Sequence, residues 1–132
     1  MQRPATDTVR EYFDAWNRRD LDALAATLHR DVEWERSAEF PEGRTLRGRE
    51  GVVDFAASMF DVFEQTPIDL RECLDAGAGE VIAAGTSRFK GTRSGAETSS
   101  SWVRVYSVRD GVIIAVRQFE TREQAEAAVG SR

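Results

Sequence analysis

The sequence contains one cysteine, one histidine and one lysine among its 132 residues. A single cysteine cannot form an internal disulfide, and without a His/Cys/Asp cluster at ligand spacing we expect no metal or other cofactor. No run approaches the roughly 20 apolar residues that a membrane-spanning helix needs, and the first ten residues lack the apolar core of a signal peptide. We therefore expect a cytoplasmic protein that does not bind a membrane.

Net positive charge is also missing. The formal net charge is −5, and no basic stretch stands apart from acidic neighbours, so we expect neither DNA nor RNA as a partner. The 17 arginines against one lysine point to GC-rich coding of the actinobacterial type rather than to a binding function. The 41% hydrophobic and 31% charged residues are typical of a globular chain, and the length predicts a single domain, residues 1–132.

Helical patterns dominate the first half of the chain. Apolar residues recur at helical spacing over Val9–Trp16, where Thr8–Glu11 has the spacing of a capping box. Asp20 is a good N-cap for a second, shorter apolar face over Leu21–Leu28. A third helix carries Val52–Phe63 and must end before the following proline, because the residue preceding proline disfavours the α region.

The second half reads as β-structure. Runs rich in β-branched and aromatic residues, separated by glycine-bearing turns, predict an antiparallel meander. The expected strands are residues 68–75, 80–90, 96–109 and 112–120. A further strand is expected at residues 32–35, and Thr121–Gln124 has the capping-box pattern that opens a short C-terminal helix. The result is an α+β fold in which a curved antiparallel sheet wraps around three helices and leaves a cone that can hold a small ligand.

Three stretches of the chain carry a family resemblance: "EYFDAWNRRDLDALAATLHRDVEW", "GREGVVDF" and "RDGVIIAVRQFETREQAEAAVG". They resemble the nuclear transport factor 2-like superfamily, in particular its SnoaL-like and ketosteroid isomerase-related branch. The resemblance covers nearly the whole chain and implies the cone-shaped, cystatin-like α+β fold. It does not imply one chemistry, because this fold hosts isomerases, hydrolases, cyclases and binding domains.

The catalytic residues of the best-marked relatives are mostly absent. The resemblance places the oxyanion-binding tyrosine of ketosteroid isomerases at Tyr12, which is present. It places their base at Arg36, their protonated aspartic acid at Arg104 and a further tyrosine at Ala56. The positions that correspond to the catalytic residues of limonene epoxide hydrolase hold Trp34, Arg36, Thr86, Arg88 and Gln118, none of which matches. The chain keeps the scaffold and lacks both catalytic sets.

Strand alternation predicts which side chains face the cone. In "DVEWERS", Val32, Trp34 and Arg36 are expected to point inward, and Glu33 and Glu35 outward. The other expected inward positions on strands are Trp102, Arg104, Tyr106, Val116, Gln118 and Glu120.

The expected chemistry centres on the two arginines. A guanidinium binds carboxylate, phosphate or enolate oxygens through a two-pronged fork, so Arg36 and Arg104 are predicted to hold an anionic oxygen. Tyr12 or Tyr106 would donate a proton, and Glu120 is the candidate base. The predicted catalytic residues are thus Tyr12, Arg36, Arg104 and Glu120. The predicted ligand-binding residues are Trp16, Trp34, Phe55, Met59, Arg88, Trp102, Tyr106, Val116 and Gln118.

Two classes of function fit this cavity. The first is an isomerase, cyclase or hydrolase acting on a polyketide-, terpenoid- or steroid-like compound. The second is a noncatalytic domain that binds a ligand or a protein partner. In the second, Arg36 and Arg104 pair with Glu120 or another inward acid, because an unpaired buried charge is costly. The facing of Arg88 depends on whether a bulge interrupts its strand.

The outer face of the sheet is the predicted surface for association of two chains. The resemblance implies pairing of two chains through this face, where alternation places Val103, Val105, Ile113 and Ala115. An exposed apolar patch usually marks an interface. We therefore predict a twofold homodimer.

Overall fold

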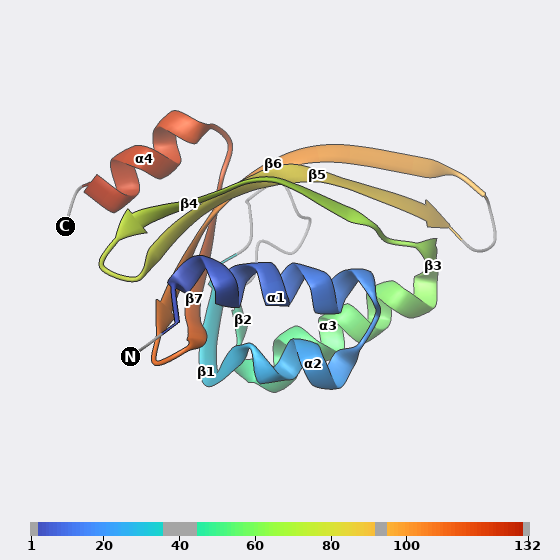
Figure 1. The fold of residues 1–132 in the computed structure, drawn as a ribbon. Helices are drawn as coiled ribbons and strands as arrows, with labels where there is room; N and C mark the ends of the chain where they lie inside the picture. The colour runs from blue at the N-terminus through green and yellow to red at the C-terminus, as the bar shows by residue number, and fades with distance from the viewer. Residues whose placement is uncertain (1–2, 36–44, 92–94, 131–132) are drawn as a thin grey trace.

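The computed structural model describes residues 3–35, 45–91 and 95–130. The helices and strands in these residues follow the predicted order of helices, then meander, then a short helix (Figure 1). They are α1 (Ala5–Asn17), α2 (Leu21–Ala26), β1 (Leu28–Glu35), β2 (Thr45–Arg47), α3 (Gly48–Val62), β3 (Phe63–Gln65), β4 (Ile68–Gly77), β5 (Glu80–Gly91), β6 (Glu97–Arg109), β7 (Val112–Phe119) and α4 (Arg122–Gly130).

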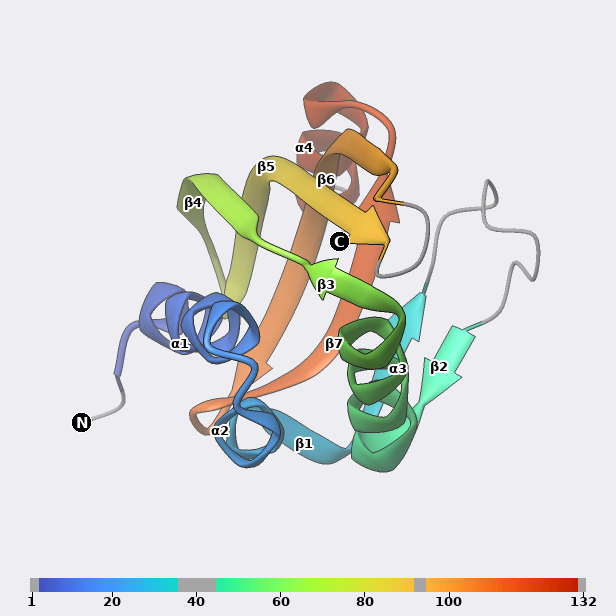
Figure 2. The same ribbon diagram turned by 90° about the vertical axis from the view of Figure 1, so that its right-hand side faces the viewer.

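The strands form one curved sheet in the order β2-β1-β7-β6-β5-β3, with β4 also paired to β5. The pairing is antiparallel except between β1 and β7, which run parallel. The sheet bends over α1, α2 and α3, and α4 lies on its opposite face (Figures 1 and 2). The predicted α+β class, with a curved sheet around three N-terminal helices, is confirmed. Within the described residues, no helix combines the length and apolarity that crossing a membrane requires.

Two of the predicted helix caps are present. The side chain of Asp20 accepts a hydrogen bond from the backbone N–H of Ala23 at 3.0 Å. At the start of α4, Thr121 Oγ1 accepts from the backbone N–H of Gln124 at 3.1 Å, and Gln124 Oε1 accepts from the backbone N–H of Thr121 at 3.3 Å. These bonds satisfy amide groups that have no partner inside the helix.

The predicted capping box at Thr8 is wrong. The helix α1 begins one turn earlier, at Ala5. Thr8 is buried, and its hydroxyl donates to the carbonyl of Gly111 at 3.3 Å. The hydroxyl therefore joins α1 to the β6–β7 turn instead of capping the helix. The second helix also ends before Leu28, which is the first residue of β1.

Side chains at the end of α1 bind backbone groups of the α3–β4 connection. Trp16 Nε1 donates to the carbonyl of Thr66 at 2.8 Å. Asn17 bonds Ile68 twice, donating to its carbonyl at 2.9 Å and accepting from its N–H at 2.8 Å. Arg19 donates to two carbonyls at the α3–β3 junction, at 2.9 and 2.8 Å. These bonds satisfy backbone groups at the ends of α3, β3 and β4 and in the connection between them, and they fix α1 against the start of β4.

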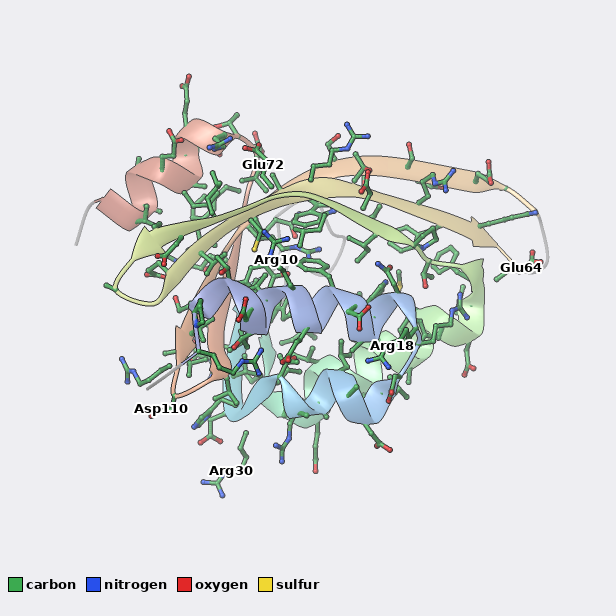
Figure 3. The ribbon with its side chains drawn as sticks, in the orientation of Figure 1. Arg10, Arg18, Arg30, Glu64, Glu72 and Asp110 are labelled. Carbon is green, nitrogen blue, oxygen red and sulfur yellow. The ribbon has the colours of Figure 1, made fainter. Side chains whose placement is uncertain are left out.

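Strand alternation in β1 and β6 follows the prediction. Val32 and Trp34 are buried while Glu33 and Glu35 are exposed. On β6, Trp102 and Tyr106 are buried on the concave side. The charged side chains of Arg30 and Asp110 lie at the periphery of the molecule (Figure 3).

The outer face differs from the expected apolar patch in two ways. The helix α4 packs there, and its Ala125 forms a cluster with Ile82 and Val105, so Val105 is fully buried. Arg122 of α4 also pairs with Glu72 of β4, and Glu72 lies on this face of the sheet (Figure 3).

The expected outward facing of Ile113 is wrong. Ile113 is fully buried in the main core. Ser107 pairs with Ala115 and the next residue, Val108, pairs with Ile113. Ile114 is thus an extra residue in β7, and a bulge of this kind reverses the facing of the residues beyond it.

Gly85 of β5 pairs with Leu70 of β4, where the backbone of β4 comes close to β5. A Cβ at this position would lie 2.0 Å from the carbonyl oxygen of Asp69 and 3.0 Å from Cζ2 of Trp102. The register of β4 against β5 shifts between Leu70 and Glu72, next to the pairing of Leu70 with Gly85. A residue without a side chain is needed here because backbone and indole occupy the space that a Cβ would take.

Replacing Gly85 tests this close approach. We expect Gly85→Ala to lower the free energy of unfolding by about 2 kcal/mol, because the methyl group forces β4 or Trp102 to move. Gly51→Ala is the matched control: no atom lies within 4 Å of its added Cβ, so it should raise the free energy of unfolding by roughly 0.5–1 kcal/mol. Urea denaturation measures both, and an unchanged midpoint for Gly85→Ala would contradict the steric argument.

Candidate functional site

A cavity of about 180 Å³ lies between the concave face of the sheet and the helices α1 and α3. Its described lining is mostly aromatic and aliphatic, with polar groups from β5, β6 and β7. The lining residues are Tyr12, Trp16, Trp34, Leu46, Val52, Phe55, Met59, Ile68, Ser87, Phe89, Ser100, Ser101, Trp102, Arg104 and Gln118. A concave apolar site with a few polar groups is the usual form of a small-molecule pocket.

Most of the predicted site residues meet in this cavity. Those that line it are Tyr12, Trp16, Trp34, Phe55, Met59, Trp102, Arg104 and Gln118. Tyr106 and Val116 are buried in the core and do not line it. Arg36 lies outside the described residues.

Glu120 and Arg88 do not face the cavity, contrary to the prediction. Glu120 is exposed, because β7 ends one residue earlier and strand alternation no longer applies; its backbone N–H bonds the Gln124 side chain at 3.0 Å. Arg88 is exposed on β5, where the preceding residue, Ser87, is buried and lines the cavity. The candidate base of the sequence prediction is therefore not positioned for that role.

Several lining residues were not predicted from the sequence. They are Leu46, Val52, Ile68, Ser87, Phe89, Ser100 and Ser101. Val52 could have been found, since it shares the apolar stripe of α3 with Phe55 and Met59 at helical spacing. The sequence gives no indication that Ser100 and Ser101 line a cavity, because the run "SSS" before Trp102 is typical of the polar end of a strand.

Arg104 is placed between two indoles. Its guanidinium carbon lies 4.6 Å from the centroid of the Trp102 ring and 5.4 Å from that of Trp34. Its Nη1 donates to the hydroxyl of Tyr106 at 3.0 Å. The faces of aromatic rings attract a cation, and a desolvated pair is stabilised more than an exposed one. The aromatic contacts and the phenol hold the guanidinium at the cavity wall.

No carboxylate neutralises Arg104 in the part of the chain that is described, since none of its ion pairs includes this residue. Its Nε is buried without a hydrogen-bond partner, as is Nε1 of Trp102. Buried donors without acceptors are rare in native structures. The alternative in which Arg104 pairs with Glu120 does not occur, because Glu120 is exposed.

The two tyrosines at this site are held in their protonated form. Burial raises the pKa of Tyr12 far above its usual range, and Tyr106 adds to the shift while Arg104 opposes it. Burial likewise raises the pKa of Tyr106, against the opposing effect of Arg104 and of its hydrogen bond. Both phenols are therefore neutral hydrogen-bonding groups at neutral pH and not bases. The described lining holds no carboxylate or imidazole.

A metal site is not formed by the described residues. No three of their His, Cys, Asp or Glu side chains are grouped so that they could hold an ion. The polar groups of the described wall are the hydroxyls of Tyr12 and three serines, the amide of Gln118, indole N–H groups and the guanidinium of Arg104.

The tyrosines give a measurable alkaline transition. They are the only two in the chain, and an unfolded tyrosine ionises near about pH 10. Because the pKa of each is raised in the folded state, their contribution to stability is complete below about pH 10 and is lost as the pH rises further. We expect tyrosinate absorbance to appear only together with the loss of tertiary structure.

The control for that titration is the same protein in denaturant, where both phenols should ionise near about pH 10. Near-ultraviolet absorbance follows tyrosinate, and circular dichroism follows folding. A smooth tyrosinate titration centred near about pH 10 in protein that stays folded would show that the rings are not buried as described.

Comparison with known proteins finds similarity along most of the chain. A family model described as a SnoaL-like domain matches residues 9–116. An NTF2-like protein of unknown function from Burkholderia pseudomallei K96243 is 22% identical, with a TM-score of 0.77 over 94% of this chain and 95% of that chain. No curated protein matches the chain.

Two further solved structures are similar in fold. A Xanthomonas campestris protein described as "a putative polyketide cyclase" is 26% identical, with a TM-score of 0.71 over 96% of each chain. A Mycobacterium tuberculosis protein, solved in complex with estradiol-17beta-hemisuccinate, is 19% identical, with a TM-score of 0.77 over 92% of this chain and 97% of that chain. These structures confirm the NTF2-like fold that the sequence predicted.

Proposed function

Because the chain belongs to the SnoaL-like domain family, we propose that its cavity binds a small, largely apolar molecule through an anionic or enolate oxygen. One observation carries this proposal: Arg104 lines the cavity, has no carboxylate partner among the described residues and keeps a buried Nε–H without an acceptor. A ligand oxygen would supply the missing acceptor and offset the charge.

The orientation of Arg104 favours a particular mode of contact. Nη1 of Arg104 donates to the hydroxyl of Tyr106. The opposite edge of the guanidinium, formed by Nε and Nη2, is left for a ligand. That edge can bind two oxygens of one carboxylate side by side, in the bidentate geometry that makes arginine selective for such groups. Tyr106 is thus a positioning residue, and Arg104 is the residue that contacts the ligand.

The rest of the lining suits a flat apolar body. Tyr12 and Trp34 lie with ring centroids 5.4 Å apart, and Phe55 and Met59 of α3 complete the described apolar wall. Estradiol-17beta-hemisuccinate, the ligand of the Mycobacterium tuberculosis neighbour, joins such an apolar body to an acid. We therefore expect polyketide-, terpenoid- or steroid-like acids and enols to be the ligand class.

An enzyme built on this site would act as an isomerase, cyclase or hydrolase by stabilising an oxyanion. Arg104 would hold the developing charge, and the neutral phenol of Tyr12 would donate a hydrogen bond. The description of the Xanthomonas campestris neighbour as "a putative polyketide cyclase" supports a cyclase. Arg36 stays a predicted second cation of this set.

A noncatalytic binding domain is the second candidate function. It is favoured by the described lining, which contains no carboxylate or imidazole, and by the raised pKa of Tyr12, which removes that phenol as a base. Both candidates begin with the same step, binding of the anionic ligand. That step is the one to test first.

Arg104→Met tests the binding step. With 2-naphthoate and its methyl ester as probes, we expect the acid to bind the folded protein more tightly than the ester, and Arg104→Met to weaken the acid by about ten- to hundredfold, the effect of losing a charge-assisted hydrogen bond. Affinity for the ester should stay unchanged. Isothermal titration calorimetry measures each constant.

Arg109→Met is the matched control, because Arg109 is exposed at the end of β6. It removes the same charge and should leave both affinities unchanged. An acid affinity that is equal in the wild type and Arg104→Met would refute the proposed role of Arg104.

We also propose that two copies pair through the outer face of the sheet. Leu74 pairs with Ile82 and therefore shares this face, where it is 40% exposed beside the α4 cluster. Because α4 covers Val105, its surface would take part in the contact.

Sedimentation velocity at micromolar concentration should show a dimer, and Leu74→Glu should convert it to monomer, because the charge would be buried without a partner. Val62→Glu is the control, since Val62 is exposed at the end of α3. A monomeric mass for the wild type would contradict the pairing.

A further inference from the structure

Trp102 has a fixed orientation and an unused donor. Its ring stacks on Phe13 with centroids 5.2 Å apart and planes at 15°, and its Cζ2 lies against Gly85. The residue is 5% exposed and lines the cavity. Its Nε1–H has no hydrogen-bond partner within the described residues.

A second buried tryptophan, Trp16 of α1, shows the usual environment of a buried indole N–H. Trp16 is also 5% exposed and also lines the cavity, but its Nε1 donates to the carbonyl of Thr66 at 2.8 Å. A buried indole N–H normally finds such an acceptor, because an unsatisfied donor costs about 1–3 kcal/mol. The missing acceptor at Trp102 therefore distinguishes this residue from Trp16.

The unused donors of Trp102 and Arg104 belong to side chains in contact with each other. The two residues are separated by one position on β6, so their side chains share the concave face. The guanidinium carbon of Arg104 is 4.6 Å from the centroid of the Trp102 ring. The indole Nε1–H and the guanidinium Nε–H are therefore both on this part of the wall, and both are buried without an acceptor in the described structure.

We propose that the ligand presents two neighbouring oxygens to this pair, an anionic oxygen to Arg104 and a second, uncharged oxygen to Trp102 Nε1. This inference rests on the proposed function of the cavity and narrows its substrate class. The ligands are hydroxy or oxo acids with the two oxygen groups on adjacent carbons, such as an aromatic ortho-hydroxy acid, or the enolate of a β-dicarbonyl compound.

The chemistry of an ortho-hydroxy acid matches the two donors. The hydroxyl of such an acid donates an internal hydrogen bond to the neighbouring carboxylate. The lone pairs of the hydroxyl oxygen can therefore accept a hydrogen bond from the indole N–H of Trp102. The carboxylate keeps an oxygen for the guanidinium edge. A plain acid satisfies Arg104 alone and leaves the Trp102 N–H buried and unpaired, which is the basis of discrimination.

The test compares two probes, 2-naphthoate and 3-hydroxy-2-naphthoate, by calorimetry. We expect the wild type to bind the hydroxy acid about five- to thirtyfold more tightly than the plain acid. Trp102→Phe keeps a ring against Phe13 and removes the N–H. It should bind the two probes equally, with the affinity for the plain acid close to that of the wild type.

Arg109→Met is the control, because Arg109 is exposed at the end of β6 and does not line the cavity. It should leave the ratio of the two affinities unchanged. The same ratio of hydroxy-acid to plain-acid affinity in the wild type and in Trp102→Phe overturns the two-oxygen inference. So does a wild type that binds the two acids equally. In both cases the proposed function stands if binding of the plain acid still depends on Arg104. Binding of neither acid overturns both.

A second measurement does not depend on the fold of Trp102→Phe. The chain has three tryptophans, so the wild type has three indole N–H signals in its ¹⁵N–¹H spectrum, which Trp16→Phe and Trp34→Phe assign. The Trp102 signal should move downfield with the hydroxy acid and much less with the plain acid. Equal shifts with the two probes contradict the second contact.

Discussion

The cavity depends on how closely β4 can approach β5 at Gly85. Antiparallel strands that carry side chains at every position could not bring the Asp69 carbonyl into the space where a Cβ would stand. With that space free, the bent sheet closes over α1 and seats the Trp102 indole between Phe13 and the backbone of β5. The absence of a side chain at Gly85 thus leaves the space that the Asp69 carbonyl and the Trp102 indole occupy.

The second defining property, within the residues that the structure describes, is that Arg104 has no carboxylate partner. A carboxylate beside Arg104 would satisfy the guanidinium and leave a self-contained wall. The chain surrounds it instead with the faces of Trp34 and Trp102 and with the hydroxyl of Tyr106. These groups stabilise the charge in part and do not cancel it. The wall therefore keeps a positive potential directed at the cavity, where a low local dielectric strengthens any contact with an anion.

The facing of side chains on regular strands could be predicted from the sequence. The points where a strand ends or contains a bulge could not. Alternation correctly placed Trp34, Trp102 and Arg104 on the concave side, because regular strands repeat every two residues. It failed at Glu120, which follows the end of β7, and at Ile113, which a bulge reverses. The unpaired donors of Trp102 and Arg104 could not be predicted either, because they depend on which acceptors lie nearby in space. Arg36 lies outside the described residues, so its placement stays a prediction.

The anchoring of α1 has a consequence for how such a protein can diversify. The hydrogen bonds of Trp16, Asn17 and Arg19 go to backbone groups at the end of α3 and along the α3–β4 connection. Trp16 and Arg19 also contact the side chain of Phe60 of α3. Substitutions along that connection leave these bonds in place as long as the backbone path is kept. Ile68, which lines the cavity, can therefore be exchanged without releasing the helix. Evolution, or a designer, can alter the shape of the binding space at this end independently of the joint that supports it.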